Sequence, residues 1–292
     1  MITGDIIIPK ILPAYDDAVF KTLLTHPDAG PVLRDVVSSV IMSPVEDVVV
    51  RNTEMPIDDT SEKRERLDIN CRTVAGELVA IEMQAEPMEG DSALHGHTNI
   101  KSRSVYNLCD LHSTQPGRGV GYADLMRSYQ VVFCNYTVFP SRPDFVSRYS
   151  LRDEDGEELS DSIGVVFIEL SKLGQVVKKG VGNMTSLEAW SVFFANAHKP
   201  EYKSLITELS DVKEEVHMAN SLLMSISQDE IQQAHYRSRR IFERDMEHGF
   251  AVARKEGRTE VAANLLEHGM SIQEVIDITG LTLEDIERLT SV

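Results

Sequence analysis

Apolar and polar residues alternate with a period of two along "LDINCRTVAGELVAIEMQ", residues 67–84. This period is typical of β-strands with one buried face, and Gly76 supplies the turn of a β-hairpin between them. The polar positions include Asp68 on the first strand, with Glu82 and Gln84 on the second. Side chains two apart on a strand share a face, so Glu82 and Gln84 are neighbours, and antiparallel pairing can bring Asp68 within their reach.

Helical and strand patterns mix along the rest of the chain up to about residue 185, and from there the pattern is almost entirely helical. Helices are predicted in residues 15–41, where "HPDAGP" splits two of them, and in 100–113. Strands are predicted in residues 44–52, 129–139 and 163–173, and a glycine-rich turn in 117–125. The change of pattern near residue 185 predicts two domains, residues 1–184 and 185–292, of which the second is α-helical.

Charge limits the classes of function that the chain can serve. Among its 292 residues, 47 are acidic and 29 basic, which gives a net charge of −18. This balance argues against a general binder of polyanions, although a local basic groove or an enzyme that recruits metal ions stays open. The 42% hydrophobic content allows a sizeable core.

Cysteine usage and hydropathy predict the compartment. The three cysteines are scattered without a CxxC spacing, so we expect neither a disulfide framework nor a zinc site. No leader segment and no apolar run of about 18 residues is recognisable. We expect a cytoplasmic protein with no membrane partner.

The polar face of the hairpin allows two interpretations. It could be a solvated face, as in many antiparallel hairpins. It could also be a site for a hard cation such as magnesium, which takes oxygen ligands from one or two carboxylates. Leu78 and Ala80 lie on the same face, which indicates partial cover. A covered carboxylate needs a partner, a proton or a metal.

The C-terminal region carries two further patterns. Arginines and lysines interleave with acids in residues 235–258, which is typical of a solvated helix face and leaves DNA contact as an alternative. Ser271 and Thr282 are predicted helix N-caps, and Gly280 ends the helix between them. We favour a small structural or oligomerisation element there, with a helix-turn-helix as the alternative.

Six short motifs in order resemble the recombination-promoting nuclease and putative transposase family of the PD-(D/E)XK nuclease superfamily. "DDAVFKTLL" is similar to the family's D-x-x-F-K motif, and "RLDINCRTVAGELVAIEMQ" to its D…E-x-Q core. "SRSVYNL" resembles its R-x-x-Y helix, and "GVGYADL" its G-x-x-Y-x-x-L turn. "VVFIELSKL" is similar to a late strand of the family, and the tail from "EGR" at residue 256 to its ending. Together the motifs span most of the chain.

The resemblance implies an α/β fold with a restriction-endonuclease-like mixed β-sheet core flanked by helices, followed by an α-helical C-terminal region. It also implies magnesium-dependent (or manganese-dependent) cleavage of DNA, linked to recombination, transposition or mobile-element defence. Asp68 and Glu82 would hold the metal. Gln84 stands where the superfamily more often has lysine, and it could orient a water or contact phosphate oxygens. The accessory residues implied are Asp17, with the adjacent Asp16 as its alternative, and Lys21, Arg103 and Tyr106.

Three functions stay open at this point. A metal-dependent DNA endonuclease leads. A non-cleaving DNA-binding or regulatory protein on a degenerate nuclease scaffold is the alternative, favoured by the acidic charge and by Gln84. The third is a structural helical assembly protein whose hairpin face is simply solvated. In each case the C-terminal helices could join copies of the chain into a homo-oligomer.

Overall fold

A computed structural model of the chain describes residues 11–52, 69–87, 98–115 and 121–290. Its strands are β1 (Val48–Asn52), β2 (Ile69–Thr73), β3 (Leu78–Gln84), β4 (Ser128–Cys134), β5 (Val146–Arg152) and β6 (Glu158–Glu169). Its first helices are α1 (Asp17–Leu24), α2 (Gly30–Ile41), α3 (Thr98–Ser113), α4 (Gly174–Lys178) and α5 (Ser186–Asn196). The later helices are α6 (Lys203–Val212), α7 (Glu214–Gln228), α8 (Glu230–Glu267), α9 (Ile272–Thr279) and α10 (Leu283–Thr290).

The six strands form one mixed sheet in the order β1-β2-β3-β4-β6-β5. β3 pairs with β4, and β4 with β6, in parallel, whereas the outer pairs are antiparallel. The predicted hairpin is present: β2 and β3 pair with Ile69 opposite Ile81, and Gly76 has a φ of 102° in the turn. The predicted mixed sheet flanked by helices is therefore confirmed.

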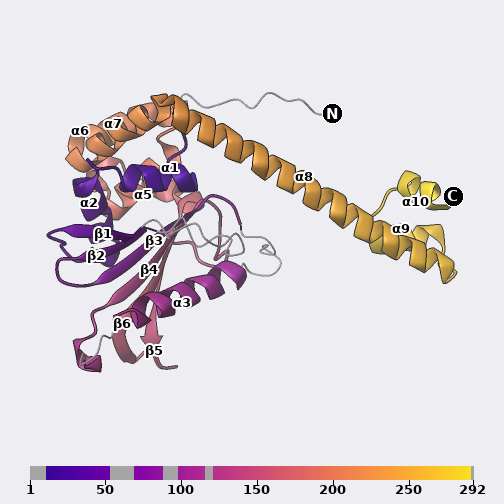
Figure 1. The fold of residues 1–292 in the computed structure, drawn as a ribbon, viewed down its shortest axis with the longest axis horizontal. Coiled ribbons are helices and arrows are strands. Elements are labelled where there is room, and N and C mark those ends of the chain that lie inside the picture. The colour runs from indigo at the N-terminus through magenta and orange to yellow at the C-terminus, as the bar shows by residue number, and fades with distance from the viewer. Residues whose placement is uncertain (1–10, 53–68, 88–97, 116–120, 291–292) are drawn as a thin grey trace. The chain divides into compact units, whose positions relative to one another are not determined.

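Helices cover both faces of the sheet (Figure 1). α3 packs on one face, where its Ile100 and Leu108 join Val132 and Phe167 in an apolar cluster. Aromatic rings fill the other face, since Phe20 of α1 lies 5.6 Å from Phe133 of β4 and 5.0 Å from Phe194 of α5 between ring centroids. Burial of such side chains contributes about 1.5–3 kcal/mol each. The central strands are thus sandwiched, and polar side chains on them are withdrawn from water.

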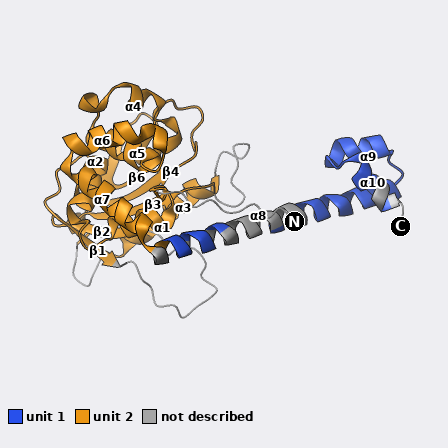
Figure 2. Cartoon of the chain, turned by 90° about the horizontal axis from the view of Figure 1, so that it is seen from above, with its two compact units in different colours: residues 1–7, 233–292 blue, residues 8–232 orange. Residues whose placement is uncertain are grey.

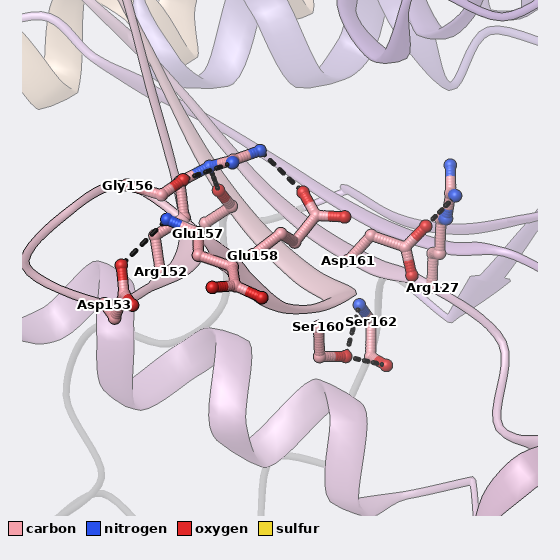
Figure 3. Close-up of polar contacts among 10 residues, drawn as sticks. Arg127, Arg152, Asp153, Gly156, Glu157, Glu158, Ser160, Asp161 and Ser162 are labelled. Carbon is pink, nitrogen blue, oxygen red and sulfur yellow. Dashed lines mark hydrogen bonds and ion pairs between the residues drawn. The ribbon is translucent and has the colours of Figure 1, made fainter.

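The outer hairpin of β5 and β6 was not predicted from the pattern of the sequence. Its end is polar: Arg152 pairs with Glu158, and Asp153 accepts hydrogen bonds from two backbone N–H groups across the turn at Gly156 (Figure 3). Arg127, immediately before β4, pairs with Asp161 of β6. The strand "VSRYSLR" shows little apolar alternation because it forms the exposed edge of the sheet.

The chain divides after Gln232 into two compact units: a first of residues 8–232, orange in Figure 2, and a second that includes residues 233–292, blue in the same figure. The first includes α5, α6 and α7 with the sheet; α2 and α5 are joined by Asp35, whose Oδ2 accepts from Trp190 Nε1 at 2.6 Å. The second holds most of α8 with α9 and α10. Separate folding of residues 1–184 and 185–292 stays a prediction.

The predicted caps in the second unit are present. The Ser271 hydroxyl accepts from the N–H of Glu274 and begins α9, and Gly280 ends it with a φ of 66°. Thr282 and Asp285 bond reciprocally at the start of α10. In the portion of the chain that is described, no helix combines the length and the apolar character needed to span a membrane.

Candidate active site

Glu82 lies in the middle of the sheet with its side chain on the face that α3 covers. It belongs to β3, whose two neighbours are β2 and β4, and its exposed fraction is 0%. Leu78 and Ala80 on the same face are 2% and 3% exposed. The premise that this face is simply solvated is therefore wrong. A carboxylate withdrawn from water to this extent requires charged or hydrogen-bonding partners.

Three side chains from three elements supply those partners. Arg103 of α3 forms an ion pair with Glu82 Oε1, and its own side chain is 23% exposed. Gln84, two residues further along β3, donates from Nε2 to the same oxygen. Gln130 of β4 lies 3.4 Å from Glu82 Oε2 through its Nε2. The structure thus brings together three of the residues expected at the site, Glu82, Gln84 and Arg103.

Gln130 is a polar residue that the sequence analysis missed. It pairs with Val165 of β6 and Ala80 of β3, so it shares the face of Glu82. Its exposed fraction is 0%, and its Oε1 has no hydrogen-bond partner among the described residues. An unpaired buried carbonyl oxygen costs about 1–3 kcal/mol. The signal was present in the sequence as one glutamine inside the apolar run "SYQVVFC".

Asp17 and Lys21 lie on α1 beside the end of β3. Asp17 Oδ1 accepts from the backbone N–H of Ala85 at 3.2 Å, immediately after Gln84. Its neighbour Asp16 instead caps α1 by accepting from the N–H of Val19. Lys21 is partly buried and follows Asp17 by four residues, so the two side chains share one face of α1. Of the two adjacent acids, Asp17 is the one that reaches the strand of Glu82.

Two other expected residues remain, Tyr106 and Asp68. Tyr106 on α3 is 66% exposed. Asp68 lies outside the described residues; it precedes Ile69, which pairs with Ile81, the residue before Glu82. Within the described ranges, no group of three or more His, Cys, Asp or Glu side chains could hold a metal ion.

A second buried carboxylate, Glu169 at the end of β6, has hydrogen-bond partners within the protein for both of its oxygens. Its Oε1 accepts from the N–H groups of Val138 and Phe139 at 2.7 and 3.0 Å, and its Oε2 is 2.7 Å from Lys172 Nζ. Cys134 pairs with Glu169 in the sheet, and burial together with this carboxylate raises the pKa of its thiol. Glu169 therefore orders the loop after β4 and pairs with Lys172.

The residues around Glu82 fit a divalent cation by their donor chemistry. Magnesium and manganese prefer oxygen ligands, and here a carboxylate and the unpaired carbonyl oxygen of Gln130 lie together in a buried site. Gln84 adds a second carboxamide. Arg103 supplies the positive charge that balances Glu82 in the structure as it stands.

Comparison with known proteins identifies the family. The model of the PD-(D/E)XK nuclease family transposase matches residues 14–253. The chain belongs to this family. The resemblance carried by the motifs is confirmed, except that its tail motif, from residue 256, lies beyond the match. No curated protein and no solved structure gives a match to the chain.

Family membership gives this PD-(D/E)XK protein a coarse role. Its relatives in this superfamily are nuclease-type hydrolases, they generally use divalent metals, and their substrate is DNA. A nuclease-like or transposition-related role follows for the chain. The covered face of β3, where Glu82 meets Gln84, Arg103 and Gln130, is the candidate active site.

Proposed function

We propose that this protein is a metal-dependent DNA endonuclease that hydrolyses phosphodiester bonds at Glu82, in recombination, transposition or defence against mobile elements. The observation that carries the proposal is the fully buried carboxylate of Glu82 beside the unpaired oxygen of Gln130. Glu82 and Asp68 would hold Mg²⁺ or Mn²⁺. When bound, the metal would polarise the phosphodiester and lower the pKa of a bound water.

The side chains around Glu82 have separate tasks in this proposal. Gln84 has both a donor and an acceptor, so it can orient a water toward the phosphorus while it holds Glu82. It has no charge to stabilise the developing phosphorane. Lys21 on α1, four residues after Asp17, is the candidate for a cation near the phosphate at this end of β3. Arg103 holds the Glu82 carboxylate in place.

The test is nicking of supercoiled plasmid with Mg²⁺, Mn²⁺ or EDTA by the wild type, Asp68→Asn and Glu82→Gln. Both substitutions keep the shape of the side chain and remove its charge. Glu158→Gln is the matched control because it removes an exposed, paired carboxylate of β6. We expect metal-dependent nicking by the wild type and the control, and none by the two site variants.

Folding must be measured beside activity, because Glu82 is buried. Circular dichroism and urea unfolding of Glu82→Gln establish whether the lost activity reflects chemistry. A wild type that stays inert with every metal would overturn the endonuclease proposal. Nicking retained by a folded Glu82→Gln variant would show that the activity has another source.

One observation favours the alternative, a non-cleaving DNA-binding protein on a nuclease scaffold. Glu82 already has a charged partner and two carboxamides within the chain, so the site is held together without a metal. This alternative expects the wild type to bind the plasmid and leave it intact. It also expects calorimetry to detect no Mn²⁺ binding that depends on Glu82.

A further inference from the structure

A cavity of about 210 Å³ lies at the opposite end of β3 from Gln84. Arg51 of β1 and Arg72 of β2 line it, together with Leu78 at the start of β3 and residues just after α3 and before β4. Two guanidinium groups around one hollow are unusual in a chain with a net charge of −18. Guanidinium groups match phosphate geometry because they can donate two parallel hydrogen bonds.

Both arginines retain free donors. Arg51 has no ion pair or hydrogen bond with any described residue, and its side chain is exposed. Arg72 donates from Nε to the carbonyl of Gly76 at 3.3 Å, which leaves its two terminal nitrogens without a partner in the described ranges. The one carboxylate in the lining, Asp124, accepts from the N–H of Gly121 at 3.3 Å. The lining therefore carries two cations and one anion.

The wall of the cavity is held by the protein itself. Gln115 pairs with the backbone of Met126, donating to its carbonyl at 2.8 Å and accepting from its N–H at 2.9 Å. The β2–β3 turn packs against this wall, since a Cβ on Gly76 would lie 3.0 Å from Met126 Cγ. A wall fixed in advance reduces the conformational entropy lost on binding.

The cavity and Glu82 share one face of the sheet. Arg72 lies opposite Leu78, so their side chains point to the same side, and Leu78 shares that side with Glu82 four residues further along β3. At about 3.3 Å per residue, Leu78 and Glu82 are about 13 Å apart along the strand. This face is open toward the sheet edge: Val49, which pairs with Arg72, is 59% exposed.

We propose that the cavity between Arg51 and Arg72 is a phosphate-binding site that anchors the backbone of a DNA strand beside Glu82. This deepens the proposed function and rests on it for the source of the phosphate. A rise of 3.4 Å per nucleotide puts the anchored phosphate about four nucleotides from the bond at Glu82. The same chemistry would hold the phosphate of a free mononucleotide.

The test measures binding and does not depend on cleavage. Anisotropy of a short fluorescein-labelled duplex in EDTA is recorded over a range of salt for the wild type, Arg51→Ala and Arg72→Ala. Thermal protection by dAMP and by inorganic phosphate is measured on the same proteins. Arg152→Ala is the matched control: it removes one exposed positive charge from β5, at the other edge of the sheet (Figure 3).

We expect each site variant to bind duplex about tenfold more weakly than the control. The slope of log K against log salt should fall by about one for each lost phosphate contact. If Arg51→Ala and Arg72→Ala bind duplex as the control does but are no longer protected by dAMP, the DNA anchor is overturned and a mononucleotide site is supported. Equal behaviour of Arg51→Ala, Arg72→Ala and Arg152→Ala with every probe would overturn the proposal.

These results separate the two proposals. If duplex binding depends on Arg51 and Arg72 while plasmid stays uncut with every metal, the phosphate site stands and the endonuclease function fails. If cleavage of plasmid depends on Glu82 while duplex binding does not depend on either arginine, the phosphate-site proposal fails and the endonuclease proposal stands. Circular dichroism of the variants shows whether the fold is kept, which we expect because both side chains are exposed.

Discussion

Arg103 on α3 forms an ion pair with Glu82 on β3, at a carboxylate that is 0% exposed. The pair joins the helix that covers the sheet to the residue at the centre of the candidate active site. A guanidinium supplies the charge that a divalent cation would otherwise supply to the same oxygens. In the proposed function, Arg103 and the metal would therefore be alternative partners for one carboxylate, and their effects on stability should be linked.

Replacing Arg103 with Gln should lower the free energy of unfolding by about 3 kcal/mol, because a buried carboxylate loses its charged partner. Urea unfolding in EDTA measures this loss. Arg152→Gln is the control, because its exposed pair with Glu158 should contribute no more than about 1 kcal/mol.

Mn²⁺ tests the linkage directly. It should restore more stability to Arg103→Gln than it adds to the wild type, because the cation then has no competitor for Glu82. Equal stabilisation of the two proteins by Mn²⁺ would contradict competition at this carboxylate.

Glu169→Gln should separate a structural carboxylate from a metal-binding one. Glu169 is as buried as Glu82, but two backbone N–H groups and Lys172 already use its oxygens. The substitution should lower stability by about 2 kcal/mol because hydrogen bonds to a charged group are lost. Calorimetry should find Mn²⁺ binding unchanged in Glu169→Gln and lost in Glu82→Gln. Loss of Mn²⁺ binding in Glu169→Gln would place this carboxylate in the metal site instead.

The sequence predicted those elements whose side-chain pattern is set by burial on one or both faces. β3 and β4 are buried over most of their length and β6 over its second half, so their apolar runs were visible, although β4 ends at Cys134 and β6 at Glu169, earlier than expected. β5 was missed because most of its side chains are exposed and polar. The caps at Ser271 and Thr282 were predictable because capping is local.

The candidate site was predictable only as far as one strand determines it. Strand periodicity predicts that Glu82 and Gln84 are neighbours, and the hydrogen bond between their side chains confirms it. The direction of Arg103 toward Glu82 depends on how α3 packs, and the role of Gln130 depends on the order of the strands. The choice between Asp16 and Asp17 required knowing where β3 ends. The catalytic roles of Asp68, Glu82 and Gln84 stay predictions.

Gly76→Ala should be more destabilising than Gly156→Ala. Both glycines lie in hairpin turns at positive φ, 102° and 88°, which strains any residue with a Cβ. A Cβ at Gly76 would also meet Met126 Cγ at 3.0 Å, whereas nothing lies within 4 Å of one at Gly156. We expect losses of about 2 and about 1 kcal/mol by urea unfolding. Equal losses would show that Met126 moves aside freely.

His198 should make the protein less stable in mild acid. Its ring packs edge-on against Tyr15, with 5.2 Å between centroids, and its buried Nδ1 has no partner among the described residues. Burial, and then the charge of Lys199, lowers the pKa of His198 from 6.5 to about 4, although Glu201 acts in the opposite direction.

The sign of the effect follows from the two pKa values. Between pH 6.5 and about 4 the unfolded chain binds the proton and the folded protein does not, so acid favours unfolding. The stability of the folded protein with His198 neutral is fully present above pH 6.5, the pKa of His198 in the unfolded chain. It is lost as the pH falls toward about 4, the pKa in the folded protein. His198→Phe keeps an aromatic ring against Tyr15 and removes the titration. The unfolding free energy of the wild type, minus that of this variant, should be flat above pH 7 and fall as the pH is lowered toward 4, since all other groups cancel. A difference that stays constant over this range would show that His198 is protonated as readily in the folded protein as in the unfolded chain.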